Sequence, residues 1–373
     1  MQHNFHGSDT EKAALAFGLK KEEIINFAAN VNPAGFSKKA AEALKDNLSV
    51  ISAYPDREYN DLKASISEYT GCKKDNILLG SGVTELLSVF TTILSPKDAA
   101  LIGPTYSEYE KDLLRLLARV HHIDALEDND FILRPEDIIK AIDLTGDKIS
   151  LLILCNPNNP TGFALKKDEI KVLADELKKR DIILMIDETY AEFSGDLNTP
   201  DDISAISLTD KCDNILVLRG TSKFFSTPGL RLGYAVTSNA GLIDKYLKQA
   251  DPWSINSVAS LIGSKMFTDD EYISGVKKEA LSELTYLKKE LSSLAGVKVY
   301  PTKANFILIR LNEEGSSVNP DSHAVFEELI KQGLMVRDCS TFTGMEGRFI
   351  RICYMKHGDN VSLVAAMKKI FER

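Results

Sequence analysis

Small polar residues follow an apolar segment near residue 80 in an order that suits phosphate binding. The apolar run 77–79 is followed by Gly80, Ser81 and Gly82, and a helical pattern begins at Val83. Free backbone N–H groups in a glycine-flanked turn at a helix start, together with a serine hydroxyl, can bind a phosphate. The alternative is a tight turn in which the serine only caps the helix.

Two later apolar segments also end in polar side chains. Residues 149–155 run into Asn-Pro-Asn-Asn-Pro-Thr-Gly at 156–162, a rigid turn that either presents side-chain amides or is purely structural. Residues 182–187 end on Asp187, which Glu188 follows. A carboxylate at the end of a buried strand costs free energy unless a cation meets it. Otherwise it caps the next helix.

A lysine follows a fourth apolar segment. The run 214–218 precedes Lys223, and Phe224 and Phe225 come directly after it. In an apolar pocket the pKa of a lysine amine falls and the amine becomes nucleophilic. A solvated loop lysine is the usual alternative for an isolated residue of this type.

The surrounding elements decide whether these four groups meet. Between about 77 and 235, short apolar runs alternate with amphipathic stretches such as the helix expected at 165–180. This alternation predicts an α/β fold with a mostly parallel, doubly wound sheet. Ligands bind beyond the carboxyl ends of such strands, so we expect all four groups to face one crevice. Together they suit pyridoxal 5′-phosphate, which has a phosphate, a ring nitrogen and an aldehyde.

The pattern changes past about residue 240. Long charged helical stretches, short strands and two further helices predict a smaller α+β unit; they are expected near 240–250, 270–295, 297–300, 304–311, 322–333, 348–353 and 359–371. We expect an N-terminal arm at 1–30 that packs on a small domain at 246–373. A large cofactor-binding domain would span 31–245.

Composition excludes several classes of protein. The 373 residues carry 45 Lys and Arg against 54 Asp and Glu, with no long basic run, which disfavours nucleic acid as a partner. Five scattered cysteines never form a CxxC pair, and the six histidines lack metal-ligand spacing, so no disulfide framework or metal site is expected. The apolar stretches are too short to span a membrane, and no secretion signal is visible, so we expect a cytoplasmic protein.

Three motifs carry a resemblance to a known family. NPNNPTG at 156–162, DETY at 187–190 and SKxxxxPGLRLGY at 222–234 occur in the order and spacing of fold type I pyridoxal-phosphate enzymes. The chain resembles the class I/II aminotransferases over nearly its whole length. This resemblance implies the fold type I architecture, pyridoxal phosphate as cofactor, and small amino and keto compounds as substrates.

The resemblance also implies roles for individual residues. Lys223 matches the lysine that binds the cofactor as a Schiff base, and Asp187 matches the partner of the pyridinium nitrogen. Tyr190 and Asn159 match the residues that bind the ring 3-oxygen, and Tyr106 matches the aromatic residue stacked on the ring. The phosphate end is expected to be held by Ser81, Gly82, Val83, Ser222 and Arg231.

Within the family, the chain is similar to the branch shared by histidinol-phosphate aminotransferase and threonine-phosphate decarboxylase. That likeness implies that Arg351 holds a substrate carboxylate, and that Arg337, His6 and Asn32 lie near a substrate phosphate. The decarboxylase opening His-Gly-Gly-Asn reads His-Gly-Ser-Asp at 6–9 here. A carboxylate at Asp9 would repel a phosphate unless it points away.

Quaternary structure and reaction follow as expectations from the same resemblance. Tyr54 matches a tyrosine that reaches the cofactor phosphate of the other subunit, which implies a homodimer. An aminotransferase is the leading interpretation and a phosphorylated-amino-acid decarboxylase the alternative. A non-catalytic sensor would need a DNA-binding segment, for which we expect no space before Phe27.

Overall fold

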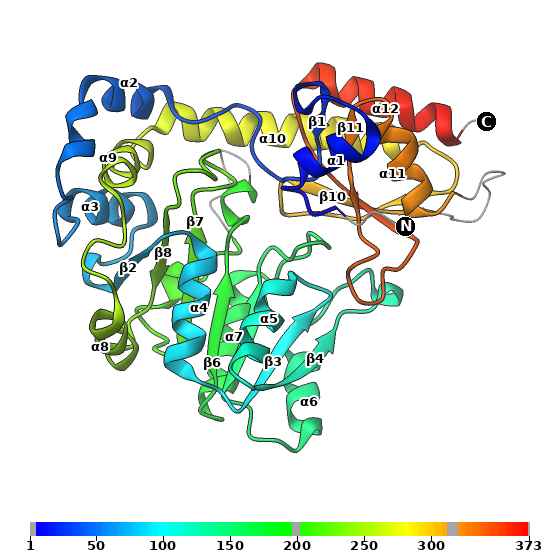
Figure 1. Cartoon of the computed structure of the whole chain (residues 1–373). Helices are drawn as coiled ribbons and strands as arrows, with labels where there is room; N and C mark the ends of the chain where they lie inside the picture. Colours follow the sequence, from blue (N-terminus) through cyan, green and yellow to red (C-terminus); the bar gives the residue numbers. More distant parts are fainter. Residues whose placement is uncertain (1–4, 196–201, 312–319, 372–373) are drawn as a thin grey trace.

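The computed structural model describes residues 5–195, 202–311 and 320–371. Its largest element is a seven-stranded sheet with the strand order β2-β8-β7-β6-β5-β3-β4 (Figure 1). These strands are β2 (Ile77–Gly80), β3 (Asp98–Gly103), β4 (Arg119–Asp124), β5 (Leu151–Cys155), β6 (Ile183–Asp187), β7 (Ile215–Gly220) and β8 (Gly233–Val236). Neighbours from β7 to β4 are parallel, and only β8 runs antiparallel to its neighbours β2 and β7. The predicted mostly parallel α/β sheet is confirmed.

Helices cover both faces of this sheet because successive side chains of a strand point to opposite sides. In β5, Leu151 and Ile153 belong to one buried cluster, whereas Leu152 and Leu154 belong to another. The first cluster includes side chains of α4 (Val83–Leu94), α5 (Ser107–Arg115) and α8 (Ala240–Gln249). The second includes side chains of α6 (Pro135–Thr145) and α7 (Lys167–Lys178). A strand buried on both faces explains the continuous apolar runs of the sequence.

The strands β4 and β8 were not visible in the sequence pattern. In β4 only Ile123 is buried, so the segment has neither an apolar run nor a regular alternation. β8 has four residues and follows closely on the loop after Lys223. Segments this short and this irregular give no periodic signal.

Three helices form a group beside the sheet, namely α2 (Lys38–Asp46), α3 (Asn60–Thr70) and α9 (Ser257–Met266). The long helix α10 (Asp270–Leu291) leads from this group to the C-terminal part of the chain (Figure 1). Among the residues that the structure describes, no helix is long and apolar enough to cross a membrane.

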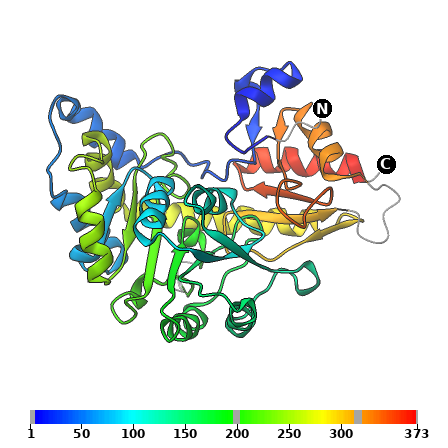
Figure 2. The ribbon, with the colours of Figure 1, turned by 60° about the horizontal axis from the view of Figure 1, so that its bottom comes forward.

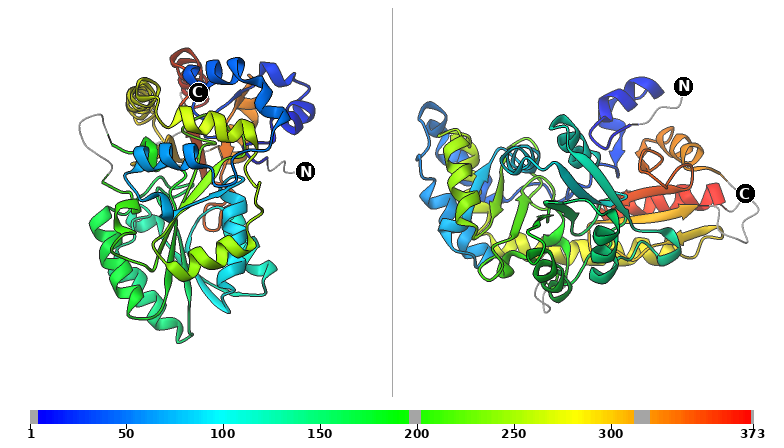
Figure 3. Two further views of the ribbon diagram at one scale, coloured as in Figure 1. Left: turned by 90° about the vertical axis from the view of Figure 1, so that its left-hand side faces the viewer. Right: turned by 90° about the horizontal axis from the view of Figure 1, so that it is seen from below.

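The C-terminal part has its own antiparallel sheet, in the order β12-β13-β10-β9. Its elements are β9 (Val297–Val299), β10 (Phe306–Leu311), α11 (Ser322–Ile330), β12 (Arg337–Asp338), β13 (Phe349–Cys353) and α12 (His357–Phe371). The N-terminal β1 (Ile25–Asn26) pairs in parallel with β11 (Leu334–Met335), and α1 (Thr10–Phe17) lies beside the same region (Figures 2 and 3). The arm therefore contacts the C-terminal part, while the domain boundaries at 30 and 245 stay predictions.

Candidate active site

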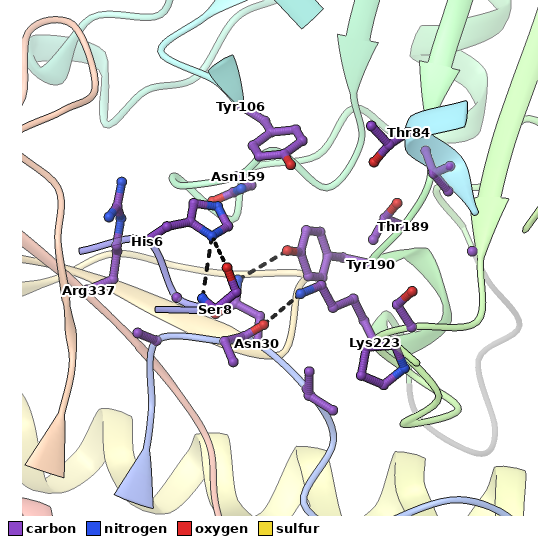
Figure 4. A pocket seen from close by; sticks show the side chains of 18 of the residues that line it. His6, Ser8, Asn30, Thr84, Tyr106, Asn159, Thr189, Tyr190, Lys223 and Arg337 are labelled. Carbon is purple, nitrogen blue, oxygen red and sulfur yellow. Dashed lines mark hydrogen bonds between the residues drawn. The ribbon is translucent and has the colours of Figure 1, made fainter. Parts of the chain in front are cut away.

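A cavity of about 460 Å³ lies between the carboxyl ends of the large sheet, the N-terminal arm and the small sheet (Figure 4). Its volume is typical of small-molecule sites. The predicted site residues that line it are His6, Val83, Tyr106, Asn159, Asp187, Tyr190, Ser222, Lys223, Arg231, Arg337 and Arg351. The predicted residues outside this lining are Asn32, Tyr54, Ser81 and Gly82.

Lys223 follows β7 and projects into the cavity. Its Nζ donates a hydrogen bond to the carbonyl oxygen of Ala29 at 2.6 Å, and the neighbouring Phe224 and Phe225 are fully buried. Burial, assisted by the positive charge of Arg351, lowers the pKa of Lys223 to about 8. About one amine in ten is then neutral at pH 7, which makes Lys223 a competent nucleophile.

Asp187 ends β6, and three hydrogen bonds orient its carboxylate. Oδ1 accepts the backbone N–H of Thr189 at 2.9 Å and the Thr189 hydroxyl at 2.5 Å, while Oδ2 accepts the Tyr109 hydroxyl at 2.7 Å. Burial raises the pKa of Asp187, and the three hydrogen bonds act in the opposite direction. A cation against the carboxylate would further favour its charged form.

The adjacent carboxylate of Glu188 has a structural role, because it binds buried side chains of the same domain. It is fully buried, and its Oε2 accepts hydrogen bonds from Nε and Nη2 of Arg219 at 3.0 and 2.8 Å. The Ser204 hydroxyl donates to the same oxygen at 2.8 Å. Arg219 therefore supplies the cation that a buried strand-end carboxylate needs, and Asp187 alone of the two faces the cavity.

Aromatic and amide side chains surround the middle of the cavity. The Tyr190 hydroxyl accepts a hydrogen bond from Nδ2 of Asn30 at 3.2 Å, and Oδ1 of Asn159 accepts one from Arg351. The Tyr106 ring stands nearly perpendicular to that of Tyr109, with centroids 5.7 Å apart. Burial raises the pKa of Tyr106 to about 12 and also raises that of Tyr190, so both hydroxyls keep their protons at neutral pH.

The turn before α4 forms another end of the site. Gly82 has φ +90°, and a Cβ there would lie 2.5 Å from Nη2 of Arg231. This Nη2 also donates a hydrogen bond to the Ser81 carbonyl oxygen at 3.2 Å. The Ser81 N–H donates to Oε2 of Glu85 at 3.0 Å, which fixes the turn. The N-terminus of α4 and the guanidinium of Arg231 therefore lie side by side, and both attract a phosphate.

Arg337 and Arg351 line the cavity from the small sheet, where they are direct partners on the antiparallel strands β12 and β13. Arg337 donates to the Phe5 carbonyl oxygen and, at 2.6 Å, to the Thr341 hydroxyl. Besides Asn159, Arg351 donates to the Ala28 carbonyl oxygen at 2.7 Å, and its buried Nε has no hydrogen-bond partner among the described residues. The two guanidinium groups give the cavity a strongly cationic wall.

Comparisons with known proteins identify the family. Residues 22–367 match the family model for aminotransferase class I and II. The chain belongs to this family. A histidinol-phosphate aminotransferase of Methanosarcina mazei is 32% identical over 366 residues, which are 97% of this chain and 92% of that protein. The threonine-phosphate decarboxylase of Salmonella typhimurium is 29% identical over 365 residues, 98% of this chain and 96% of that protein. The crystal structure of a histidinol-phosphate aminotransferase from Clostridium acetobutylicum superposes with a TM-score of 0.84 at 27% identity, covering 92% of this chain and 98% of that one.

As a member of the class I and II aminotransferases, the chain is a pyridoxal-phosphate-dependent enzyme of fold type I. The donors in the cavity fit this cofactor. The turn at Gly82 with Arg231 would hold the phosphate, Asp187 the ring nitrogen and Lys223 the aldehyde carbon. In addition, Oδ1 of Asn30 and Nε of Arg351 are buried polar atoms without a partner among the described residues, and such atoms point to a polar ligand.

Asn32 is absent from the cavity lining, and its contact with a substrate stays a prediction. Its backbone N–H donates to the Lys223 carbonyl oxygen at 3.1 Å. Both protons of its side-chain amide are also in use, since Nδ2 donates to the Phe224 carbonyl oxygen at 2.9 Å and to the Tyr272 hydroxyl at 3.1 Å. Asn32 thus holds the segment that carries the lysine, and Asn30 lines the cavity instead.

Asp9 points away from the cavity. Its Oδ2 accepts the backbone N–H of His6 at 2.9 Å, and Oδ1 pairs with Nζ of Lys12 at 3.1 Å. Asp9 is absent from the cavity lining, whereas His6 and Ser8 belong to it. The carboxylate that departs from the decarboxylase opening therefore pairs with Lys12 and does not line the cavity beside Arg337.

Sequence reasoning missed three residues of the site, namely Tyr109, Thr189 and Asn30. Tyr109 lies three residues after Tyr106, which caps α5, and a helical spacing of three predicts that two side chains share one face. That spacing was a usable signal. Thr189 acts through a local turn at Asp187, and Asn30 through a hydrogen bond to the distant Tyr190, and neither contact leaves such a periodicity in the sequence.

A possible metal-binding group lies at the other end of the sheet. Asp98, His121 and Asp147 place ligand atoms within 4.8 Å of one another. Arg119 contacts Asp98 at 2.6 Å and Asp147 at 3.1 Å. Because this guanidinium already pairs with both carboxylates, the group is explained as an ion-pair cluster that joins β3 to β4.

Proposed function

We propose that the protein is an aminotransferase that moves an amino group from an amino acid or a phosphorylated amino compound to a keto acid, in the manner of the histidinol-phosphate aminotransferases. Bound pyridoxal phosphate would supply the aldehyde that accepts the amine and a ring that withdraws electrons. Lys223, neutral at Nζ, would carry the proton between the substrate Cα and the aldehyde carbon. Asp187 would keep the ring nitrogen protonated, with Tyr109 and Thr189 holding its carboxylate.

The observation that carries this proposal is the pair of arginines opposite each other on β12 and β13. Cross-strand partners have Cβ atoms about 5 Å apart, and like charges at such positions destabilise a sheet. Among the described residues no carboxylate forms an ion pair with Arg337 or Arg351, so the repulsion calls for an anionic ligand. Guanidinium groups bind carboxylate and phosphate through two parallel hydrogen bonds. The pair therefore suits an amino compound that carries one or two acidic groups.

The orientation of Asp9 favours a second candidate, decarboxylation of a phosphorylated amino acid. With its carboxylate turned toward Lys12, Asp9 leaves the phosphate-binding side of the cavity cationic. The similarity to the decarboxylase of Salmonella typhimurium supports the same candidate. The two reactions differ in which bond at Cα the arginines hold perpendicular to the cofactor ring.

A half-reaction separates the two candidates. An aminotransferase given an amino donor alone converts the bound aldehyde stoichiometrically to its amine form without releasing CO₂, and a keto acid restores the aldehyde. A decarboxylase releases CO₂ catalytically from threonine phosphate with no acceptor present. Absorption spectra of the bound cofactor and CO₂ measurement distinguish these results. Acceptor-independent CO₂ release at an enzyme-like rate would reject transamination and establish decarboxylation.

We further propose that the protein acts as a homodimer in the cytoplasm. Tyr54 is 80% exposed, and its ring lies tilted beside that of Trp253, with ring centroids 4.9 Å apart. Leu48 and Ile51, on the turn just before it, are exposed as well. Grouped exposed apolar side chains are typical of interfaces, and a second copy of the chain would cover them. Sedimentation of the holoenzyme tests this: a Tyr54→Asp, Ile51→Asp double variant should dissociate to monomers.

A further inference from the structure

The segment 6–9 forms a turn that is fixed on the wall of the cavity. The Asp9 N–H donates to the His6 carbonyl oxygen at 2.9 Å, and Oδ2 of Asp9 accepts the His6 N–H at the same distance. Nδ2 of Asn26 donates to the Gly7 carbonyl oxygen at 2.8 Å. Gly7 has no space for a Cβ, which would lie 2.3 Å from the Ala28 carbonyl oxygen. The backbone that carries His6 is therefore held from both sides.

Within the part of the chain that the structure describes, the imidazole of His6 has two hydrogen-bond contacts, and both come from Ser8. Nδ1 lies 2.9 Å from the Ser8 hydroxyl oxygen and 3.4 Å from the Ser8 backbone nitrogen (Figure 4). Because a backbone N–H can only donate, its long 3.4 Å contact favours a lone pair on Nδ1, and the Ser8 hydroxyl at 2.9 Å makes the stronger contact with that nitrogen. The hydroxyl then donates to the same nitrogen. The ring proton consequently lies on Nε2.

The surroundings favour the neutral ring. Partial burial, followed by the charges of Arg337, Lys223 and Arg351, lowers the pKa of His6, and only the Asp9 carboxylate acts in the opposite direction. Figure 4 shows the imidazole with Ser8 on one side and Tyr106 on the other, and the two ring centroids of His6 and Tyr106 are 6.3 Å apart. A neutral imidazole whose proton is on Nε2 offers one hydrogen-bond donor to the cavity.

We propose that Ser8 is a positioning residue that fixes His6 as the Nε2–H tautomer, so that this N–H donates to the acidic group held by Arg337. The inference rests on the proposed function, because it assumes an anionic substrate group at Arg337. It assigns a purpose to a serine that replaces glycine in the decarboxylase opening. Ser8 and His6 lie at the mouth of the cavity, where water competes, so the expected effect is moderate.

The first test observes the tautomer directly. In the holoenzyme, the ¹³C and ¹⁵N chemical shifts of His6 should report the Nε2–H form, and the His6→Gln spectrum identifies the signal. In Ser8→Ala the shifts should move toward a mixture of tautomers, and Ser8→Thr should restore the wild-type values. Asp9→Ala is the matched control, because it loosens the backbone of the turn but keeps both contacts to Nδ1. An Nδ1–H form in the wild type, or unchanged shifts in Ser8→Ala, would overturn the proposal.

The second test measures binding with two probes. Ser8→Ala should weaken the binding of O-phospho-L-threonine about three- to tenfold, as expected for one hydrogen bond, and leave L-threonine unaffected. Equal losses for both probes would mean that Ser8 only supports the fold and would reject the positioning role. If Arg337→Ala fails to discriminate between the probes, Arg337 does not hold a substrate phosphate and this part of the proposed function fails, while the tautomer measurement still decides the role of Ser8.

Discussion

The Tyr109 hydroxyl donates a 2.7 Å hydrogen bond to Oδ2 of Asp187 in the buried interior of the sheet edge. This relationship connects α5, which begins just after Tyr106, to the end of β6. Since Thr189 occupies Oδ1 twice, the carboxylate has a defined orientation before any ligand arrives. Such preorganisation is how an enzyme stabilises charge that develops during a reaction.

Replacing the carboxylate tests its role most directly. We expect Asp187→Asn to bind pyridoxal phosphate but to lose several powers of ten in kcat, because a neutral amide cannot hold the ring-nitrogen proton. Electrostatic contributions of this kind are worth ~3 kcal/mol or more. Single-turnover kinetics would measure the loss. A decrease below about tenfold would mean that Asp187 mainly fixes the turn to Thr189.

Removing one hydroxyl tests the support of that carboxylate. We expect Tyr109→Phe to lower kcat about ten- to a hundredfold, because a hydrogen bond to a charged group is worth about 1.5–3 kcal/mol. Tyr246→Phe is the matched control: Tyr246 is also buried and donates to a backbone oxygen, that of Leu79, outside the cavity. Both variants should lose stability in urea, but only Tyr109→Phe should change the cofactor spectrum and kcat. Equal kinetic effects would remove Tyr109 from the site.

The lowered pKa of Lys223 predicts a pH dependence. Only the neutral amine attacks an aldehyde, and with a pKa of about 8 the neutral fraction rises about tenfold between pH 7 and pH 9. The rate at which apoenzyme captures pyridoxal phosphate should therefore rise about tenfold over this range and level off above it. Stopped-flow absorbance would follow the capture, and Lys223→Ala should show neither turnover nor the visible band. A rate that still rises steeply above pH 10 would mean an ordinary solvated lysine.

Adding a methyl group at Gly82 tests the phosphate-binding turn. The Cβ would collide with the Arg231 guanidinium, so Gly82→Ala should lower the affinity for pyridoxal phosphate at least about tenfold. The affinity for pyridoxal, which lacks the phosphate, should fall far less. Gly146→Ala is the control, since Gly146 also has positive φ but nothing within 4 Å of its Cβ. That control should lose roughly 1 kcal/mol of stability and keep its cofactor affinity. Equal affinity losses for both ligands would argue against a phosphate contact.

Arg337 should discriminate between substrates. Arg337→Ala is expected to weaken the binding of phosphorylated substrates by roughly 2–5 kcal/mol, because the buried phosphate would lose its cationic partner. Plain amino acids should be affected little, because Arg351 would still bind their carboxylate. Titrations of the holoenzyme followed by absorbance give both affinities. A uniform loss across the two substrate classes would instead indicate that Arg337 mainly anchors the arm through the Phe5 carbonyl oxygen.

From the sequence alone, the five apolar strands of the large sheet could be predicted, and so could the residues expected at the cofactor end of the site. Buried parallel strands need continuous apolar runs, and polar residues at their carboxyl ends must meet on one edge, so Asp187 and Lys223 could be placed from pattern alone. Which of the neighbouring polar side chains face the cavity is visible only in the tertiary structure. The side chains of Asn32 and Glu188 make hydrogen bonds inside the protein, while Asn30 and Tyr109 line the site. Asp9 likewise turned out to pair with Lys12. Such choices depend on which long-range partner satisfies each donor or acceptor, and contacts between residues far apart in the chain leave no periodic trace in it.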